Sequence, residues 1–169
     1  MGDVFKEQIV KRKSSTKDGF IRFGLILAVL LVAIIAFSVI PQFAPFVILA
    51  AGFGAWFLTS FLKVEYEYAF TDGELDIDAI YNRSRRKRLF SARVNDFEIM
   101  AHVEDKMRMG DFQGAVETHD YSSGVVGNNT YAFMVNYKGK RTKIIIEPNE
   151  VMLKALAGVL TRRRLHLKP

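Results

Sequence analysis

The sequence predicts an α+β membrane protein in which a hairpin of two transmembrane helices is followed by a seven-stranded antiparallel β-sandwich or barrel and a C-terminal helix. Residues 23–62 contain no Asp, Glu, Lys, Arg or His. This run of 40 residues is too long for a core helix and long enough for two membrane spans. After it, apolar and polar residues alternate in short segments, as in half-buried strands. A helical apolar pattern then follows Pro148.

The two spans are expected over residues 23–40 and 46–62. At 1.5 Å per residue they cover about 27 and 25 Å, close to the thickness of a bilayer's hydrocarbon core. Pro41 and Pro45 break the helix between them. Small residues allow close approach of membrane helices. We expect helix–helix packing at Gly24, Ala28, Ala50, Gly52 and Gly54.

Charge predicts how the chain is oriented in the membrane. Residues 1–22 carry six Lys and Arg residues, whereas the connector between the spans carries none. The positive-inside rule therefore predicts a basic cytoplasmic N-terminal segment over residues 1–22. The main topology signal is Lys11, Arg12 and Lys13. Two spans return the chain to the same side, so the sequence predicts a multi-pass protein of the cell membrane with both termini in the cytoplasm.

Residues 63–169 are predicted to form one cytoplasmic domain. A flexible hairpin tip is expected over residues 122–129, which are rich in Gly, Ser and Asn. A C-terminal amphipathic helix is expected over about residues 148–163, with Met152 and Leu156 on its apolar face. The seven strands are expected near residues 64–70, 75–81, 88–92, 97–103, 115–121, 130–137 and 141–147.

Four segments carry a resemblance to a known family: residues 64–68, 73–77, 85–88 with Phe97 and Glu98, and 144–150. Together with the order of strands and helix, they resemble small bacterial two-span membrane proteins that carry a pleckstrin-homology-like (PH-like) domain. The resemblance implies a PH-like fold and a role in binding or assembly at membranes. It brings no catalytic or cofactor-binding residues.

The strongest local charge feature is the cluster Arg83, Arg85, Arg86, Lys87 and Arg88. One interpretation is contact with anionic lipid headgroups or a protein partner. The other is a solvated connector whose cations pair with Asp76, Asp78 or Asp96. Nucleic acid is not an expected partner, because residues 63–169 hold 18 Lys and Arg against 15 Asp and Glu and lack a broad basic field.

No motif indicates catalysis, a cofactor or a metal. The chain has no cysteine, and His102, His119 and His166 lack the spacing of metal ligands. The Ser122-Ser123-Gly124 stretch lacks the nucleophile-elbow pattern, and no phosphate-binding loop is present. We therefore expect a protein that is not an enzyme.

These observations favour a membrane-anchored binding or scaffolding protein that presents its domain at the cytoplasmic face of the membrane. Its expected partners are the membrane itself, anionic lipid headgroups, and a protein partner or a second copy of the chain. The alternative is an accessory subunit of a membrane protein complex whose main interface is the transmembrane hairpin.

Overall fold

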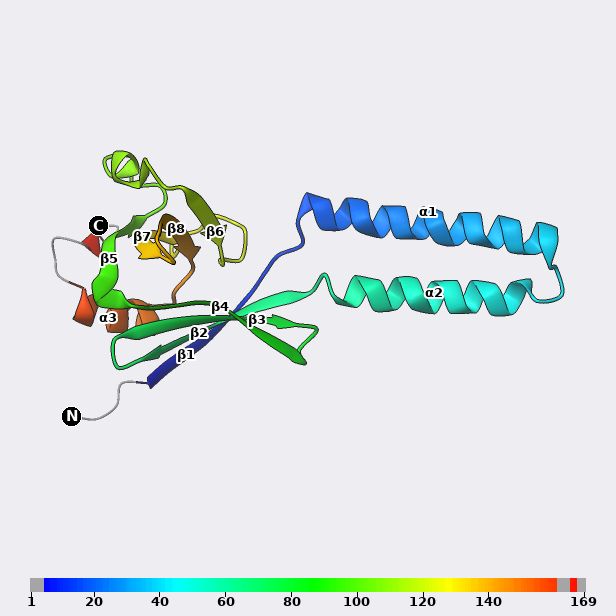
Figure 1. The fold of residues 1–169 in the computed structure, drawn as a ribbon, viewed down its shortest axis with the longest axis horizontal. Coiled ribbons are helices and arrows are strands. Elements are labelled where there is room, and N and C mark those ends of the chain that lie inside the picture. The colour runs from blue at the N-terminus through cyan, green and yellow to red at the C-terminus, as the bar shows by residue number, and fades with distance from the viewer. Residues whose placement is uncertain (1–4, 161–164, 167–169) are drawn as a thin grey trace. The chain divides into compact units, whose positions relative to one another are not determined.

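The computed structural model describes residues 5–160 and 165–166, which form two compact units (Figure 1). One unit is the helical segment Ser14–Val64. The other is a β-domain assembled from the chain before and after that segment. The described residues contain three α-helices and two sheets, which confirms the α+β class.

The first sheet has the order β1-β2-β3-β4. Its strands are β1 (Phe5–Lys11), β2 (Val64–Thr71), β3 (Glu74–Tyr81) and β4 (Arg85–Arg93). β1 pairs antiparallel with β2 along its whole length, from Phe5 opposite Thr71 to Lys11 opposite Glu65. The helical segment is thus an insertion between two hydrogen-bonded neighbours of one sheet. β1 was not expected from the sequence, where these residues belong to a predicted charged segment outside the domain.

The second sheet has the order β6-β8-β7-β5-β9. The antiparallel strands β5 (Phe97–His102), β7 (Tyr131–Tyr137) and β8 (Lys140–Ile146) form its centre. Two short strands, β6 (Glu117–Asp120) and β9 (Leu165–His166), pair parallel to β8 and β5. The described strands therefore exceed the seven antiparallel ones that the sequence predicts. Two short 3₁₀ turns, Val94–Asp96 and Met109–Phe112, complete the connections.

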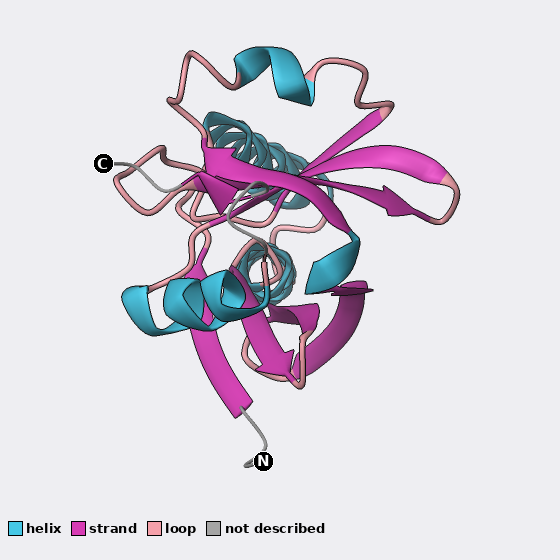
Figure 2. Cartoon of the chain, turned by 90° about the vertical axis from the view of Figure 1, so that its left-hand side faces the viewer, coloured by secondary structure: helices cyan, strands magenta, loops and turns pink. Residues whose placement is uncertain are grey.

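The core of the domain lies where apolar side chains of both sheets meet. Phe97 and Phe133 stack with their ring centroids 3.9 Å apart, and Phe90 packs against Phe133. The C-terminal helix α3 (Glu150–Val159) lies beside β1 and contributes Met152 and Leu156 to the core (Figure 2). This helix is shorter than expected: it ends at Val159, and residues 161–164 lie outside the described residues.

The helical unit consists of α1 (Thr16–Val39) and α2 (Ala44–Ser60), which contact one another side by side (Figure 1). Among the described helices, α1 alone is long and apolar enough to cross a membrane, while α2 is also apolar but has only 17 residues. The buried small residues of the pair are Ala36 and Ala44.

None of the expected packing residues is buried in this pair, and their packing against another helix stays a prediction. Gly24, Ala28 and Ala50 are exposed in the pair. Gly52 and Gly54 are half-buried, but a Cβ atom built on either of them, or on Gly24, would meet no other atom within 4 Å. Small residues occur on more than one face of each helix, so their spacing alone could not show which face the partner helix takes.

Candidate functional site

The basic cluster lies at one end of the first sheet. β2 begins at the residue where the helical segment ends, and two residues separate the end of β1 from the start of that segment. Because the strands alternate in direction, the end of β3 and the start of β4 lie at this same end, with Tyr81 opposite Arg85. Residues 82–84 join these strands in a turn in which Asn82 and Arg83 adopt positive φ angles of 48° and 57°. The turn therefore lies where the chain leaves the sheet for α1 and re-enters it from α2.

Two cations of the cluster are neutralised by neighbouring strands. Arg86 Nη1 lies 2.9 Å from Glu67 Oε2 on β2. Arg88 Nη1 lies 2.9 Å from Asp76 Oδ2, and its Nε donates to Asp78 on β3. The pairing that the sequence analysis offered as its second interpretation is thus present for Arg88 with Asp76 and Asp78. Asp96 instead lines a pocket at the start of β5.

The other three cations are more open to solvent. Arg85 and Lys87 alternate with Arg86 and Arg88, so they point to the opposite face of the sheet. Both are exposed, and neither forms an ion pair with any residue that the structure describes. The Arg83 side chain is 81% exposed, and its Nε lies 4.0 Å from Glu65. We call Arg83, Arg85 and Lys87 the turn cations.

We call the face of the sheet that carries Arg86 and Arg88 the paired face. Its most buried charged side chain is Glu67. Its side chain is only 6% exposed, whereas that of its partner Arg86 is 62% exposed. Burial raises the pKa of Glu67, and a hydrogen bond with Glu7 raises it further, while Arg86 acts in the opposite direction. On the next strand, the hydrogen bond to Asp78 raises the pKa of Arg88. This face is a set of internal charge pairs rather than an open basic surface.

Lys11, Arg12 and Lys13, the expected topology signal, belong to the β-domain. Lys11 is the last residue of β1, opposite Glu65, and the backbone N of Lys13 donates to Ser123 O at 2.8 Å. Ser123 lies in the segment expected to be a flexible hairpin tip. Both Ser122 and Ser123 are instead buried, and hydrogen bonds tie them to Asp120 and Glu147. Sequence composition showed the loop but could not show these long-range bonds.

Tyr68 links β1, β2 and the C-terminal part of the domain from the interior. Its hydroxyl donates to Tyr121 O and accepts from Glu147 N at 3.2 Å. Beside it, Gln8 Nε2 donates to Glu147 O at 2.8 Å, and Asn149 N donates to Gln8 Oε1 at 2.7 Å. Burial raises the pKa of Tyr68 well above its ordinary value. The neutral hydroxyl is therefore a structural group.

Over residues 5–160 and 165–166, no group of three His, Cys, Asp or Glu side chains could hold a metal ion. His102 is buried between loops: its Nε2 lies 3.0 Å from Gly127 O, and its Nδ1 accepts from Glu104 N at 3.2 Å. This pattern assigns the proton to Nε2 and gives the ring a structural role. His119 is half-buried beside Glu117, and His166 is half-buried in β9.

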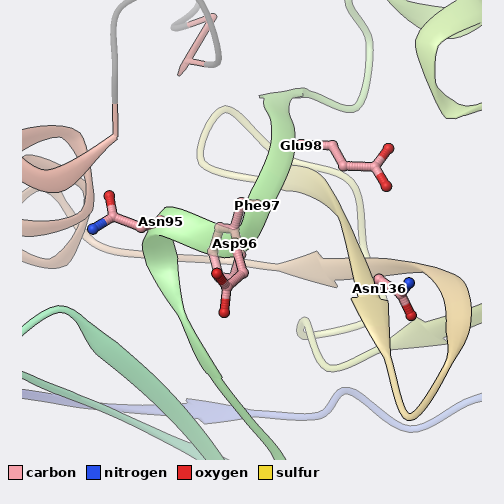
Figure 3. A pocket seen from close by; sticks show the side chains of 5 residues that line it. All are labelled: Asn95, Asp96, Phe97, Glu98 and Asn136. Carbon is pink, nitrogen blue, oxygen red and sulfur yellow. The ribbon is translucent and has the colours of Figure 1, made fainter.

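One open pocket of about 580 Å³ lies beside β5 and is lined by Asn95, Asp96, Phe97, Glu98 and Asn136 (Figure 3). Its two carboxylates point in different directions (Figure 3). Glu98 Oε2 is held 2.8 Å from Arg141 Nη2. A catalytic or ligand site needs polar groups that converge on one point, and these do not.

A family model described as "Bacterial PH-like domain (DUF6106)" matches residues 2–165. The chain belongs to this family. The matched range includes β1, both helices of the insertion and the strands β2 to β8. PH-like domains generally serve as binding modules rather than catalysts, which agrees with the resemblance noted in the sequence. Comparison with curated proteins and with solved structures found no match.

Proposed function

We propose that this PH-like protein is a non-enzymatic binding or scaffolding module that α1 and α2 anchor in the cell membrane, with the β-domain at the cytoplasmic face. The observation that carries the proposal is the pairing of β1 with β2. These strands lie on either side of the insertion in sequence, yet they share seven paired positions. A hydrogen-bonded sheet cannot straddle a bilayer, so the insertion must leave and re-enter the domain on one side.

Because both ends of the insertion join the same sheet, the chain must cross the membrane twice or not at all. α1 is long and apolar enough to cross. If it crosses, α2 must bring the chain back, and its 17 residues cover about 25 Å, which a locally thinned bilayer accommodates. Both helices are apolar all round, with exposed residues such as Leu30, Phe46 and Trp56. Lipid is the solvent that suits such helices.

The charges of the chain favour the cytoplasmic side for the β-domain. Arg12, Lys13, Lys17 and Arg22 lie in and just before the first turns of α1, whereas the connector between α1 and α2 carries no charge. Cytoplasmic flanks of membrane helices are enriched in Lys and Arg. Both termini of the chain are then cytoplasmic.

The turn cations are positioned to contact anionic headgroups or an acidic partner at the membrane surface. Residues 12–15 and 61–63 connect the sheet to the helices and reach at most about 14 and 11 Å when fully extended. The sheet end that carries the turn cations is therefore tethered close to the bilayer. Each cation near an anionic surface contributes about 1 kcal/mol.

Single cysteines test the topology cleanly, because the chain has none of its own. Gln42→Cys places a thiol in the connector between the helices, and Lys106→Cys places one in an exposed loop of the domain. In intact bacterial cells, a membrane-impermeant maleimide should label position 42 and spare position 106. Inverted vesicles should give the reverse. Labelling of both positions from the same side would overturn the two-span proposal.

Charge reversal tests the turn cations. Arg85→Glu with Lys87→Glu should reduce the anionic lipid or protein partner that co-purifies in mild detergent, as read by mass spectrometry. The matched control is Lys106→Glu with Lys154→Glu, which makes the same charge change at exposed residues elsewhere in the domain. An equal loss from both variants would show that only net charge matters. No loss from either would remove the turn cations from the binding surface.

One observation favours the alternative, an accessory subunit that binds its complex through the hairpin. Gly24, Ala28 and Ala50 are exposed small residues that the α1–α2 contact leaves unused. Such residues allow a further helix to approach closely. Ala28→Phe should then release a co-purifying membrane protein that Arg85→Glu with Lys87→Glu retains. The opposite pattern would favour the binding module.

A further inference from the structure

The loop between β6 and β7 carries two exposed apolar side chains at a rigid tip. Val125 is 48% exposed and Val126 is 59% exposed. No charged residue occurs from Tyr121 to Tyr137, although charged residues make up a quarter of the whole chain. We call Val125 and Val126 the valine tip. It lies in an uncharged stretch of an otherwise charged domain.

Hydrogen bonds fix both sides of this tip. On the first side, Ser122 N and Oγ donate to Asp120 Oδ1 at 2.9 and 2.6 Å, and Ser123 N donates to Glu147 Oε2 at 3.0 Å. On the second side, Gly127 N donates to Thr130 Oγ1 at 2.8 Å. His102 Nε2 donates to Gly127 O at 3.0 Å. The two valines thus protrude from an ordered loop, and little conformational entropy remains to be lost when they bind.

The loop is also fixed to the place where the chain departs for α1. Lys13 N donates to Ser123 O at 2.8 Å, and α1 begins three residues later at Thr16. Val125 follows Ser123 by two residues. The loop that carries Val125 is therefore bound to the last part of the β-domain before the chain continues to α1, at the sheet end that also carries the turn cations.

We propose that Val125 and Val126 insert into the headgroup–acyl boundary of the same bilayer that α1 crosses, and so hold the PH-like domain in one orientation on the membrane. This inference rests on the proposed membrane anchoring. The apolar tip supplies a hydrophobic contact, and the exposed Lys13, whose backbone N binds Ser123 O, supplies a cation for the headgroups around it. The covalent tether keeps the tip near the surface, so a contact of two side chains is sufficient for orientation.

A nitroxide spin label tests the depth of this loop in the full-length protein reconstituted in nanodiscs that contain anionic lipid. Val126→Cys carries the label at the tip. Val116→Cys is the matched control, because Val116 is also an exposed valine, at 69%. It differs in position: it lies just before β6, whereas the valine tip follows this strand. Ile34→Cys reports on α1 itself. Collision rates with oxygen, which enriches in lipid, and with a nickel chelate, which stays in water, are compared at each site.

We expect the oxygen-to-nickel collision ratio to be several-fold higher at position 126 than at position 116, and highest at position 34. A ratio at position 126 equal to that at position 116, with position 34 in lipid, would overturn the inference and leave the anchoring intact. Water-like ratios at all three positions would overturn both. A second variant, Val125→Asp with the label at 126, should lower the ratio at 126 toward that of position 116, because a carboxylate opposes insertion.

Discussion

The β-domain and the helical insertion use the same kinds of residue in opposite ways. In the domain, large apolar side chains such as Phe90, Phe97 and Phe133 are fully buried, and charges lie outside in pairs. In the insertion, Leu30 and Phe46 are exposed, and the buried residues include the small Ala36 and Ala44. The domain thus buries its apolar side chains as a water-soluble fold does, whereas the proposed anchoring supplies an apolar solvent for those of the insertion. Only the two short connections between them must suit both environments.

The largest expected effect comes from separating the two regions. Lys11 and Glu65 are paired neighbours on adjacent strands, so a short Gly/Ser linker can replace residues 14–63 without straining the sheet. We expect this variant to move from the membrane fraction to the soluble fraction and to retain the β-rich circular dichroism of a folded domain. Size-exclusion chromatography should show a compact species. Aggregation of the variant would show that the domain depends on the insertion for its fold.

The next effect compares one truncation in each region. Phe133→Ala removes a ring that packs against Phe90 and Phe97, and should lower the free energy of unfolding of the domain by about 3–5 kcal/mol. Leu30→Ala removes an exposed side chain of α1, and lipid can fill the space that it leaves. Its effect should stay below about 0.5 kcal/mol.

Pulse proteolysis in mild detergent measures both values. A large loss from Leu30→Ala would show that this helix face packs against protein in the membrane. That result would favour the accessory-subunit alternative over the lipid-exposed hairpin, and the comparison between the two regions would then fail.

The sequence predicts these two regions unequally well. The strands β2, β3 and β8 follow from local alternation, β7 from its apolar run, and the β7–β8 hairpin from Lys138 and Gly139, which adopt positive φ angles of 53° and 79°. β1 could not be predicted in this way. Its inward position at Gln8 is polar because it binds Glu147 and Asn149, and its partner strand lies beyond the whole insertion.

The candidate site shows a similar division. The basic run was visible in the sequence, but its separation into two faces depends on strand alternation, and the pairing of Arg88 with Asp78 depends on the register of β3 and β4. The valine tip was read as a flexible loop, because its hydrogen bonds join residues far apart in the chain. Local pattern predicts elements, while the contacts that give a surface its character come from register and long-range pairing.

The smallest expected effect concerns Glu67, the most buried charge of the paired face. Its folded-state pKa is raised above the ordinary value of 4.5, so the folded domain holds this proton more tightly than the unfolded chain does. The stabilising contribution of the neutral carboxyl is therefore fully present below about pH 4 and is lost as the pH rises through the folded-state pKa. Glu67→Gln has a side chain of the same shape that stays neutral at every pH, so this variant does not lose that stabilising contribution.

The free energy of unfolding of Glu67→Gln should therefore increase relative to that of the unmodified protein between about pH 4 and pH 7. Urea denaturation at several pH values measures the difference. Arg86→Gln should act in the opposite sense, because Arg86 lowers the pKa of Glu67 and its removal deepens the loss at neutral pH. Arg85→Gln, on the other face of the same strand, should change neither curve. If Arg85→Gln and Arg86→Gln behaved alike, the division of the basic run into paired cations and turn cations would have no energetic meaning.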